Sequence, residues 1–416
     1  MGDAWLVGTA STPFQRHPGR SLASLSEEVV RGALGDARAG GQAVERVFFG
    51  NCAMHTWGQS NIRGQVALGG LFRAGELSAD AAVVNIEAAC ATGSATLAAA
   101  VEAVRGGAVH TALAVGAEKV FHPDDPVATF GVFLSGADVA AREAWLGHVA
   151  AEAEAHGLPF APHRHRIVFV DIHALQAAWH AKTYGTTWEQ VAAVAAKDHA
   201  HGALNPKAQY GSPTTAEAVL ADKPVGIGRL TRSMCAPVSD GAAAVVVVSD
   251  QGLQRLPPEA RARAVKVRSC VLTGGRWRGL GEPSVVDRGA ARGLAAAGIT
   301  GADIDIAEVH DAASSCEIEA IEALGLCPHG EGGPFSASGA TRLGGEVPVN
   351  LSGGLVSKGH PLAATGLGMV DELIAQLRGE GGERQVPGAG IGVAQNAGGL
   401  VALDEAVCGV TVLERC

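Results

Sequence analysis

The stretch Ala81-Ala-Val-Val-Asn-Ile-Glu-Ala-Ala-Cys-Ala-Thr-Gly-Ser-Ala-Thr-Leu-Ala-Ala-Ala-Val-Glu-Ala-Val-Arg105 predicts a β-strand, a cysteine and then a helix. Apolar residues dominate the strand and small residues dominate the helix, so both are expected to pack inside an α/β protein. Cys90 stands at their junction, where the unpaired N–H groups of a helix start favour the nucleophilic thiolate. The stretch alone leaves two interpretations open, a catalytic cysteine and a buried structural one.

Strand and helix signals alternate on both sides of this stretch, in two series with the same order. We expect an N-terminal half over residues 1–255 and a C-terminal half over residues 262–416, joined near Arg255–Arg261. Strands are predicted at 4–10, 46–50, 82–86, 111–115, 242–250, 264–272, 304–309, 388–394 and 400–404. Helices are predicted at 22–39, 60–72, 90–105, 285–298, 314–325 and 360–379. Two longer helices, at 170–184 and 187–199, fall in an insertion of about residues 119–240, which is expected to cover a substrate site.

Composition narrows the class of protein. The 416 residues are 47% hydrophobic and 18% charged, and the net charge is −10 without a block of Lys or Arg. Nucleic acid and an anionic membrane are therefore not expected as partners, and no apolar run is long enough for a transmembrane helix. The eight cysteines form no CxxC pair, which favours a reducing cytoplasm. The histidines of the insertion lack metal-ligand spacing, so no metal is predicted.

Two histidines of the C-terminal half stand where elements end. His310 follows the predicted strand 304–309, and His360 precedes a helix in Gly353-Gly-Leu-Val-Ser-Lys-Gly-His-Pro361. Ligands of α/β proteins gather beyond the carboxyl ends of the strands, where Cys90 is also expected. A cysteine with two histidines at this edge indicates nucleophilic catalysis.

The chain resembles the thiolase superfamily, and within it the sterol-carrier-protein-2 (SCP2) type thiolases. The resemblance covers essentially the full length and is carried by the motifs above together with Gly58–Leu68, Asn85–Ser94, Tyr184–Val191, Asn205–Gln209, Cys235–Ala244 and His310–Ala313. It implies two βαβαβαββ halves in a five-layer α/β/α/β/α body, a loop domain over the active site, and a homodimer or tetramer.

The resemblance also implies roles in acyl transfer. Cys90 would attack an acyl-CoA thioester and carry the acyl group, and His360 would take the thiol proton. His310 would donate a hydrogen bond to the thioester oxygen of the second substrate, and the N–H groups of Cys90 and Gly398 would form a second oxyanion hole. Coenzyme A would be substrate and product, with no bound cofactor.

One departure concerns proton transfer. Thiolases usually carry a second reactive cysteine in a C-x-G element, and Asn396 occupies that position in Gln395-Asn-Ala-Gly-Gly399. An amide cannot act as an acid or base at ordinary pH. Related sequences place a cysteine after His-Asp, where this chain has Ala312. Cys316, one helical turn further on, either substitutes for it or is a core-facing thiol.

Three functions remain open at this stage. The leading hypothesis is an acyl-CoA C-acyltransferase of thiolase type in lipid metabolism, cleaving a 3-ketoacyl-CoA or running the reverse Claisen condensation through acyl-Cys90. Asn396 and Ala312 keep a non-thiolytic or decarboxylating condensing enzyme open, because loss of carbon dioxide forms the carbanion without a base. The third is an acyl-CoA-binding subunit acting with a small OB-fold, zinc-bearing (DUF35-like) partner protein. Pro162-His-Arg-His-Arg166 and Lys207 are candidates for contacts to the CoA phosphates, or a solvated basic surface.

Overall fold

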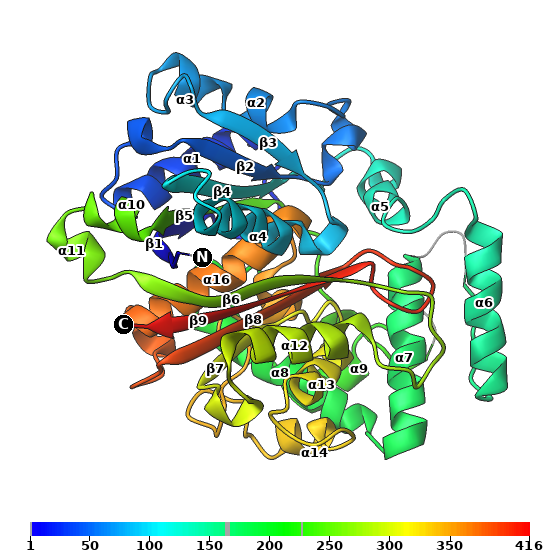
Figure 1. The fold of residues 1–416 in the computed structure, drawn as a ribbon. Coiled ribbons are helices and arrows are strands. Elements are labelled where there is room, and N and C mark those ends of the chain that lie inside the picture. The colour runs from blue at the N-terminus through cyan, green and yellow to red at the C-terminus, as the bar shows by residue number, and fades with distance from the viewer. Residues whose placement is uncertain (1, 163–166, 226–227) are drawn as a thin grey trace.

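The computed structural model describes residues 2–162, 167–225 and 228–416, and these ranges form one sheet of nine strands (Figure 1). The strand order is β3-β2-β4-β5-β1-β6-β9-β8-β7. The strands are β1 (Ala4–Ser11), β2 (Arg46–Gly50), β3 (Ala82–Ile86), β4 (Thr111–Glu118), β5 (Gly241–Ser249), β6 (Val265–Gly274), β7 (Ile306–Val309), β8 (Ile391–Gly398) and β9 (Val407–Arg415). The five strands of the N-terminal half meet the four of the C-terminal half where β1 pairs antiparallel with β6 over two residues, Trp5 with Lys266 and Leu6 with Val265.

Helices cover both halves and also separate them. Helices α1 (Leu22–Asp36), α2 (Arg63–Ala67) and α3 (Gly69–Arg73) cover the N-terminal strands, and α12 (Val285–Ala297) and α13 (Ser314–Ala323) cover the C-terminal ones. Between the halves lie α4 (Thr92–Arg105) and α16 (Leu362–Arg378), which contact each other and strands of both halves (Figure 1). This order gives five layers, so the predicted thiolase-type layering is confirmed. Among the described residues the C-terminal half has four strands instead of the five in βαβαβαββ, and an isolated bridge between Ala307 and Val349 stands where the fifth would pair.

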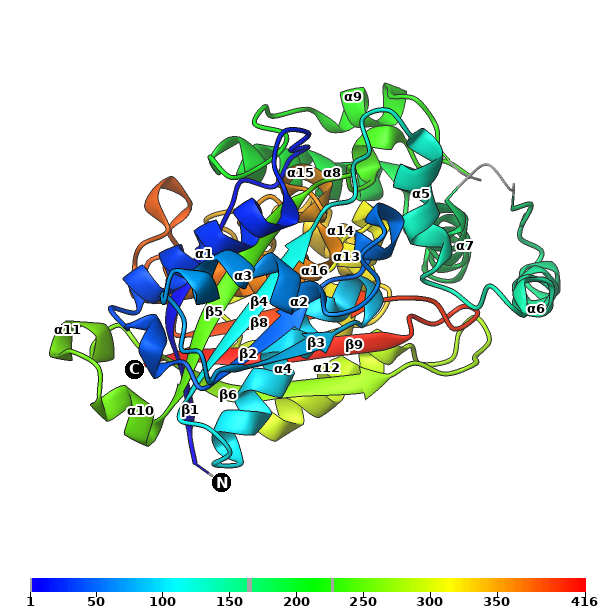
Figure 2. The same ribbon diagram turned by 90° about the horizontal axis from the view of Figure 1, so that it is seen from above.

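The remaining helices lie mostly in the insertion. They are α5 (Pro126–Leu134), α6 (Arg142–Ala155), α7 (Val168–Tyr184), α8 (Trp188–Ala203) and α9 (Ala216–Ala221), with α10 (Asp250–Gln254), α11 (Pro258–Arg261), α14 (Gly332–Ala337) and α15 (Gly354–Lys358) elsewhere. Viewed from above, α5 to α9 gather at one end of the sheet (Figure 2). Among the described residues, no helix has the length and apolar character needed to cross a membrane.

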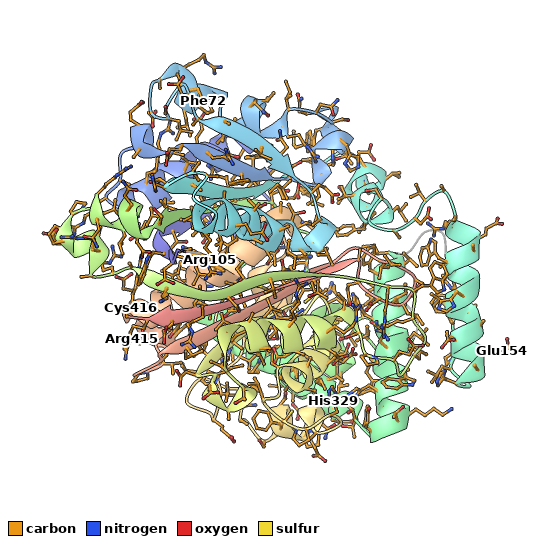
Figure 3. All side chains as sticks on the ribbon, in the orientation of Figure 1. Phe72, Arg105, Glu154, His329, Arg415 and Cys416 are labelled. Atoms are coloured by element: carbon orange, nitrogen blue, oxygen red, sulfur yellow. The ribbon has the colours of Figure 1, made fainter. Side chains whose placement is uncertain are left out.

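Strong local signals explain why most predicted elements form. Strands β4 and β5 are apolar and almost entirely buried, as expected for central strands covered on both faces. Helix α12 begins with a capping box, in which Ser284 and Asp287 exchange hydrogen bonds. Arg105, labelled in Figure 3, ends α4 and donates to the carbonyl oxygens of Val267 and, at 3.3 Å, Arg268 on β6, which ties the central layer to the C-terminal half.

One predicted strand is wrong. Residues 400–404 form a turn closed by a bridge between Val401 and Asp404, and the last strand is β9. Gly399 and Ala402 have left-handed φ angles of 70° and 59°, which interrupt an extended chain. The apolar composition of Leu400–Asp404 reflects packing against α6 and α7 of the insertion instead of sheet formation.

Candidate active site

Cys90 is presented by a strained turn between β3 and α4. The turn is a 3-10 segment at Ala89–Ala91, and Ala89 has a φ of 47°, a left-handed value that a residue with a Cβ adopts at a cost of about 1–3 kcal/mol. Thr92 holds this conformation: its hydroxyl donates to Ala89 O at 2.7 Å and accepts from Ala88 N at 2.8 Å. Strain that is stabilised by its surroundings is typical of a functional position.

The C-terminal half places two imidazoles against this thiol. His310 follows β7 and His360 lies between α15 and α16. The Sγ of Cys90 and one ring nitrogen of each histidine all lie within 4.8 Å of one another, and the two ring centroids are 5.1 Å apart. All three residues are buried. The structure therefore brings together the three predicted catalytic residues, two from one half and one from the other.

Hydrogen bonds define the proton positions on His360. The Thr365 hydroxyl lies 3.2 Å from the carbonyl oxygen of Pro361, one helical turn back, and 2.7 Å from His360 Nδ1. Its single proton goes to the carbonyl, which leaves the hydroxyl oxygen to accept from Nδ1. With its proton on Nδ1, the ring has a lone pair on Nε2, which is buried without a hydrogen-bond partner. His360 is therefore a base aimed into the site.

His310 has the opposite tautomer. The Asn396 amide donates from Nδ2 to His310 Nδ1 at 2.8 Å, and its Oδ1 accepts from Ser94 Oγ at 3.0 Å. Because Nδ1 accepts, the ring proton is on Nε2, and His310 is a hydrogen-bond donor. Asn396, at the position of the missing second cysteine, thus has a different task, namely orienting His310.

Burial keeps the cysteine–histidine pair neutral at rest. It raises the pKa of the Cys90 thiol to about 12, although the N–H groups of Gly399 and Cys90 oppose this shift. Burial also lowers the pKa of His360 to about 3 and holds that of His310 well below its usual value. The backbone N–H groups at the turn favour the thiolate, as expected, but desolvation outweighs them.

Strand β8 packs closely against the Cys90 turn at a glycine, Gly398. A Cβ on Gly398 would lie 2.5 Å from Cys90 N and closer still to Ala91 N, so only glycine fits between β8 and the turn. Of the two N–H groups that lower the thiol pKa, one belongs to Cys90 itself and the other to Gly399, the residue after Gly398. The role of the Gly398 N–H in an oxyanion hole stays a prediction, and Gly399 is an additional candidate donor.

Two buried carboxylates, which had no predicted role, connect the elements of the site. Glu118, at the end of β4, accepts from Cys52 N at 3.0 Å, Ala53 N at 2.8 Å and Ala363 N at 3.2 Å, and so ties α16 to the N-terminal half. Burial raises the pKa of Glu118 to about 7. Asp311, directly after His310, accepts from the backbone N–H groups of Leu355 at 2.7 Å and Val356 at 3.3 Å. The sequence signal for Glu118 is an acidic residue at a strand end, and Asp311 lies within the motif His310–Ala313.

The remaining predicted residues lie in different places. Cys316 lies 3.5 Å from His173 Nδ1, and the two face each other between α13 and α7. Lys207 is 2.9 Å from Asp371 Oδ2 and also donates to Ser11 Oγ, so its cation is engaged within the protein. The basic cluster at 163–166 lies outside the described residues. The thiol and two imidazoles are also zinc-type ligands, so the absence of a metal stays a prediction.

Comparisons with known proteins agree with this architecture. The family model described as "Thiolase, N-terminal domain" matches residues 4–212, and "Thiolase C-terminal domain-like" matches residues 279–410. Fold and site together define an α/β enzyme of the acyltransferase class. The chain belongs to the thiolase family, and the thiolase-type acyltransferase class predicted from the sequence is confirmed.

Two relatives are similar to the chain in sequence, and one solved structure is similar to it in fold. Sterol carrier protein 2 of Rattus norvegicus is 32% identical, over 95% of this chain and 69% of the relative. Acetyl-CoA acetyltransferase of Methanothermobacter thermautotrophicus is also 32% identical, over 96% of this chain and 97% of the relative. The solved structure of an "Ltp2-ChsH2(DUF35) aldolase" has a TM-score of 0.77 at 22% identity and covers 100% of this chain and 98% of its own.

Proposed function

We propose that this protein transfers acyl groups through a thioester on Cys90, with acyl-CoA as substrate and coenzyme A as product. The observation that carries the proposal is the cluster of Cys90 Sγ and the ring nitrogens of His310 and His360 within 4.8 Å. The likeness to an acetyl-CoA acetyltransferase over almost its whole length supports acyl-CoA as the substrate class.

The first half-reaction follows from the tautomer of His360. As Sγ attacks the thioester carbon, its proton moves to the free Nε2 of His360, since both groups are neutral at rest. The tetrahedral oxygen takes hydrogen bonds from backbone N–H groups at the Cys90 turn. The CoA sulfur then leaves with the proton from His360, and the acyl group remains on Cys90.

The second half-reaction uses His310. Its Nε2–H, oriented by Asn396, donates to the thioester oxygen of the second acyl-CoA and stabilises the enolate. The enolate carbon attacks the acyl carbon on Cys90 and forms a 3-ketoacyl-CoA, and thiolysis is the reverse.

The test measures the two half-reactions separately. Incubation with acetyl-CoA should add one acetyl group to Cys90, located by peptide mass spectrometry, and incubation of acetoacetyl-CoA with CoA should give acetyl-CoA. Cys90→Ala should lose both, while Cys327→Ala, a second buried thiol outside the site, should keep both. A Cys90→Ala protein that cleaves acetoacetyl-CoA as fast as the wild type contradicts the acyl-cysteine mechanism.

Asn396 favours a second candidate, a decarboxylating condensing enzyme, because no cysteine is present at this position to exchange the α-proton. Such an enzyme would acylate Cys90 in the same way and then use a malonyl-type thioester. Carbon dioxide release from malonyl-CoA that depends on acyl-Cys90, without cleavage of acetoacetyl-CoA, would favour this candidate.

We also propose a homodimer formed through the edge of β3, a tetramer being the larger alternative. Strand β3 ends the sheet and is largely exposed, with Val84 41% exposed, and Val66 and Ile62 beside it are 51% and 59% exposed. An unpaired apolar strand edge is suited to pairing with a second copy.

A small OB-fold, zinc-bearing partner of DUF35 type is a further proposal, supported by the DUF35 component named for the similar aldolase. All eight cysteines are free, which supports a reducing compartment such as the cytoplasm.

A further inference from the structure

A third buried histidine lies beside the two in the site. His173 belongs to α7, in the insertion, and is only 7% exposed. A charge on His173 would lower the pKa of both His310 and His360, so its ring lies within electrostatic range of both. Nothing in the acyl-transfer steps above uses it.

The neighbours of His173 face the same void as His310. A small cavity of about 20 Å³ is lined by His310, Cys316 and Gln176, and Gln176 lies one turn beyond His173 on α7. A larger cavity of about 380 Å³ shares Gln176 and Arg278 with it and extends to the exposed His329, labelled in Figure 3. Gln176 and Cys316, two residues that contact His173, therefore line a hollow that begins at His310 and runs toward the surface.

The proton positions on His173 follow from Gln176. The Gln176 amide donates from Nε2 to the carbonyl oxygen of Leu403 at 2.9 Å, so its Oε1 faces His173 Nδ1 at 3.2 Å. An amide oxygen can only accept a hydrogen bond, which places the ring hydrogen on Nδ1. The lone pair is then on Nε2, and within the described ranges Nε2 makes no hydrogen bond. His173 is held as a neutral base.

Cys316 is not suited to the same task. Its thiol faces the protonated Nδ1 of His173, so no base is available there to take the thiol proton. Burial and the nearby Glu319 raise its pKa well above the usual value for cysteine. A thiolate at this position is disfavoured, and the unprotonated nitrogen of the pair is His173 Nε2.

We propose that His173 is the base that exchanges a proton with the α-carbon of the second acyl-CoA, in place of the missing second cysteine; this inference rests on the proposed function. His173 Nε2 takes the α-proton, and the C–H electron pair becomes the enolate whose oxygen binds His310. The enolate carbon bonds to the acyl carbon, the C–S bond to Cys90 breaks, and its electron pair returns to sulfur. The proton held by His173 then restores the Cys90 thiol by way of His360.

Deuterium exchange tests this step without the full reaction. The full-length protein is incubated with acetyl-CoA or propionyl-CoA in D2O, and mass spectrometry follows deuterium at the α-carbon. We expect exchange by the wild type, a loss of about 100-fold or more in His173→Asn, and acetylation of Cys90 within a few-fold of wild type in that variant. Cys316→Ala is the matched control, and it should keep both the exchange and the acetylation.

Several outcomes would overturn the assignment. The first is deuterium exchange by His173→Asn at the same rate as by the wild type, and the second is loss of exchange in Cys316→Ala. The third is a wild-type protein that acetylates Cys90 but exchanges the α-protons of neither acetyl-CoA nor propionyl-CoA. A His173→Asn protein that no longer acetylates Cys90 also overturns it, because His173 would then serve the first half-reaction or the fold. Failure of the wild type to acetylate Cys90 rejects the proposed function instead, so the two failures are distinguishable.

Discussion

At the scale of single residues, hydrogen bonds to three imidazoles decide what each ring does. Thr365 and Gln176 leave Nε2 unprotonated on His360 and His173, whereas Asn396 leaves the proton on Nε2 of His310. Burial keeps the rings neutral, since it lowers the pKa of each. The division of roles therefore depends on neighbours that carry no charge themselves.

Asn396→Asp tests the orientation of His310. A carboxylate accepts where the amide donates, so the ring proton would move to His310 Nδ1 and the donor facing the enolate would be lost. We expect the rate of carbon–carbon bond cleavage to fall by about 10²–10³-fold, with Cys90 acetylation little changed. Steady-state cleavage of acetoacetyl-CoA and burst-phase acetylation measure the two effects.

The matched control for this prediction is Asn205→Asp, a buried amide that donates to Ser352 O at 2.8 Å away from the cluster. Asn205→Asp should lower the free energy of unfolding, and it should change the rates of Cys90 acetylation and acetoacetyl-CoA cleavage by the same factor. Equal losses of acetylation and cleavage in Asn396→Asp would show that Asn396 does not act through His310.

At the scale of elements, the site depends on close contact between β8, the Cys90 turn and α16. Gly398 leaves room for the turn, and Gly116 on β4 leaves room for the backbone of α16 at Ala363. Glycines at these crossings let elements from the two halves approach more closely than side chains would permit. The distance from Cys90 to His360 is set by this packing.

Gly398→Ala tests the contact between β8 and the turn. The added methyl would overlap Cys90 N and Ala91 N, so β8 or the turn has to shift. We expect a loss of about 1–3 kcal/mol in the free energy of unfolding and at least a 10-fold slower acetylation of Cys90. Gly274→Ala, where nothing lies within 4 Å of the added Cβ, should change neither; similar behaviour of the two variants would contradict the prediction.

At the scale of the whole molecule, buried neutral histidines link stability to pH. His201 accepts from Leu343 N at Nε2 and donates from Nδ1 to Asn350 O, both at 3.0 Å, and burial lowers its pKa to about 3. The unfolded chain therefore binds a proton between pH 6.5 and pH 3 that the folded protein does not. Stability from this residue is fully present above pH 6.5 and is lost as the pH falls.

His201→Gln should flatten this pH dependence. Between about pH 6 and pH 4, the slope of unfolding free energy against pH should be smaller by about 1.4 kcal/mol per pH unit than in the wild type, because one proton fewer is taken up on unfolding. Urea denaturation at several pH values measures the slopes. The control His55→Gln, at an exposed ring, should follow the wild-type curve, and parallel curves for all three proteins would reject the assignment.

The exposed edge of β3 leads to a prediction about assembly. Val84→Asp places a charge on the unpaired strand, and desolvating that charge in an interface is unfavourable. We expect the wild type to be a dimer by light scattering and the variant to be a monomer with an unchanged circular dichroism spectrum. Val139→Asp, at a residue 66% exposed but outside the sheet, should leave the dimer intact. A monomeric wild type would contradict the proposed interface.

Local patterns in the sequence were sufficient for the repeated halves, most strand positions, and the candidates Cys90, His310 and His360. Strand periodicity, helix starts and ordered motifs are short-range properties, so they can be read along the chain. The predicted strand at 400–404 shows the limit, because its apolar residues pack against the insertion while left-handed angles at Gly399 and Ala402 bend the chain.

Only the tertiary structure decided the protonation of the site and the candidate base. A helix start by itself favours a thiolate at Cys90, but burial by both halves raises the pKa of that thiol to about 12. In the sequence, Asn396 marks only the absence of the second cysteine. In the fold, its amide orients the ring of His310, 86 residues away along the chain. His173 carries no motif, and it becomes a candidate base only because α7 brings it within 3.5 Å of Cys316, which lines the same cavity as His310. Desolvation and hydrogen bonding depend on neighbours distant along the chain, and the fold alone supplies those neighbours.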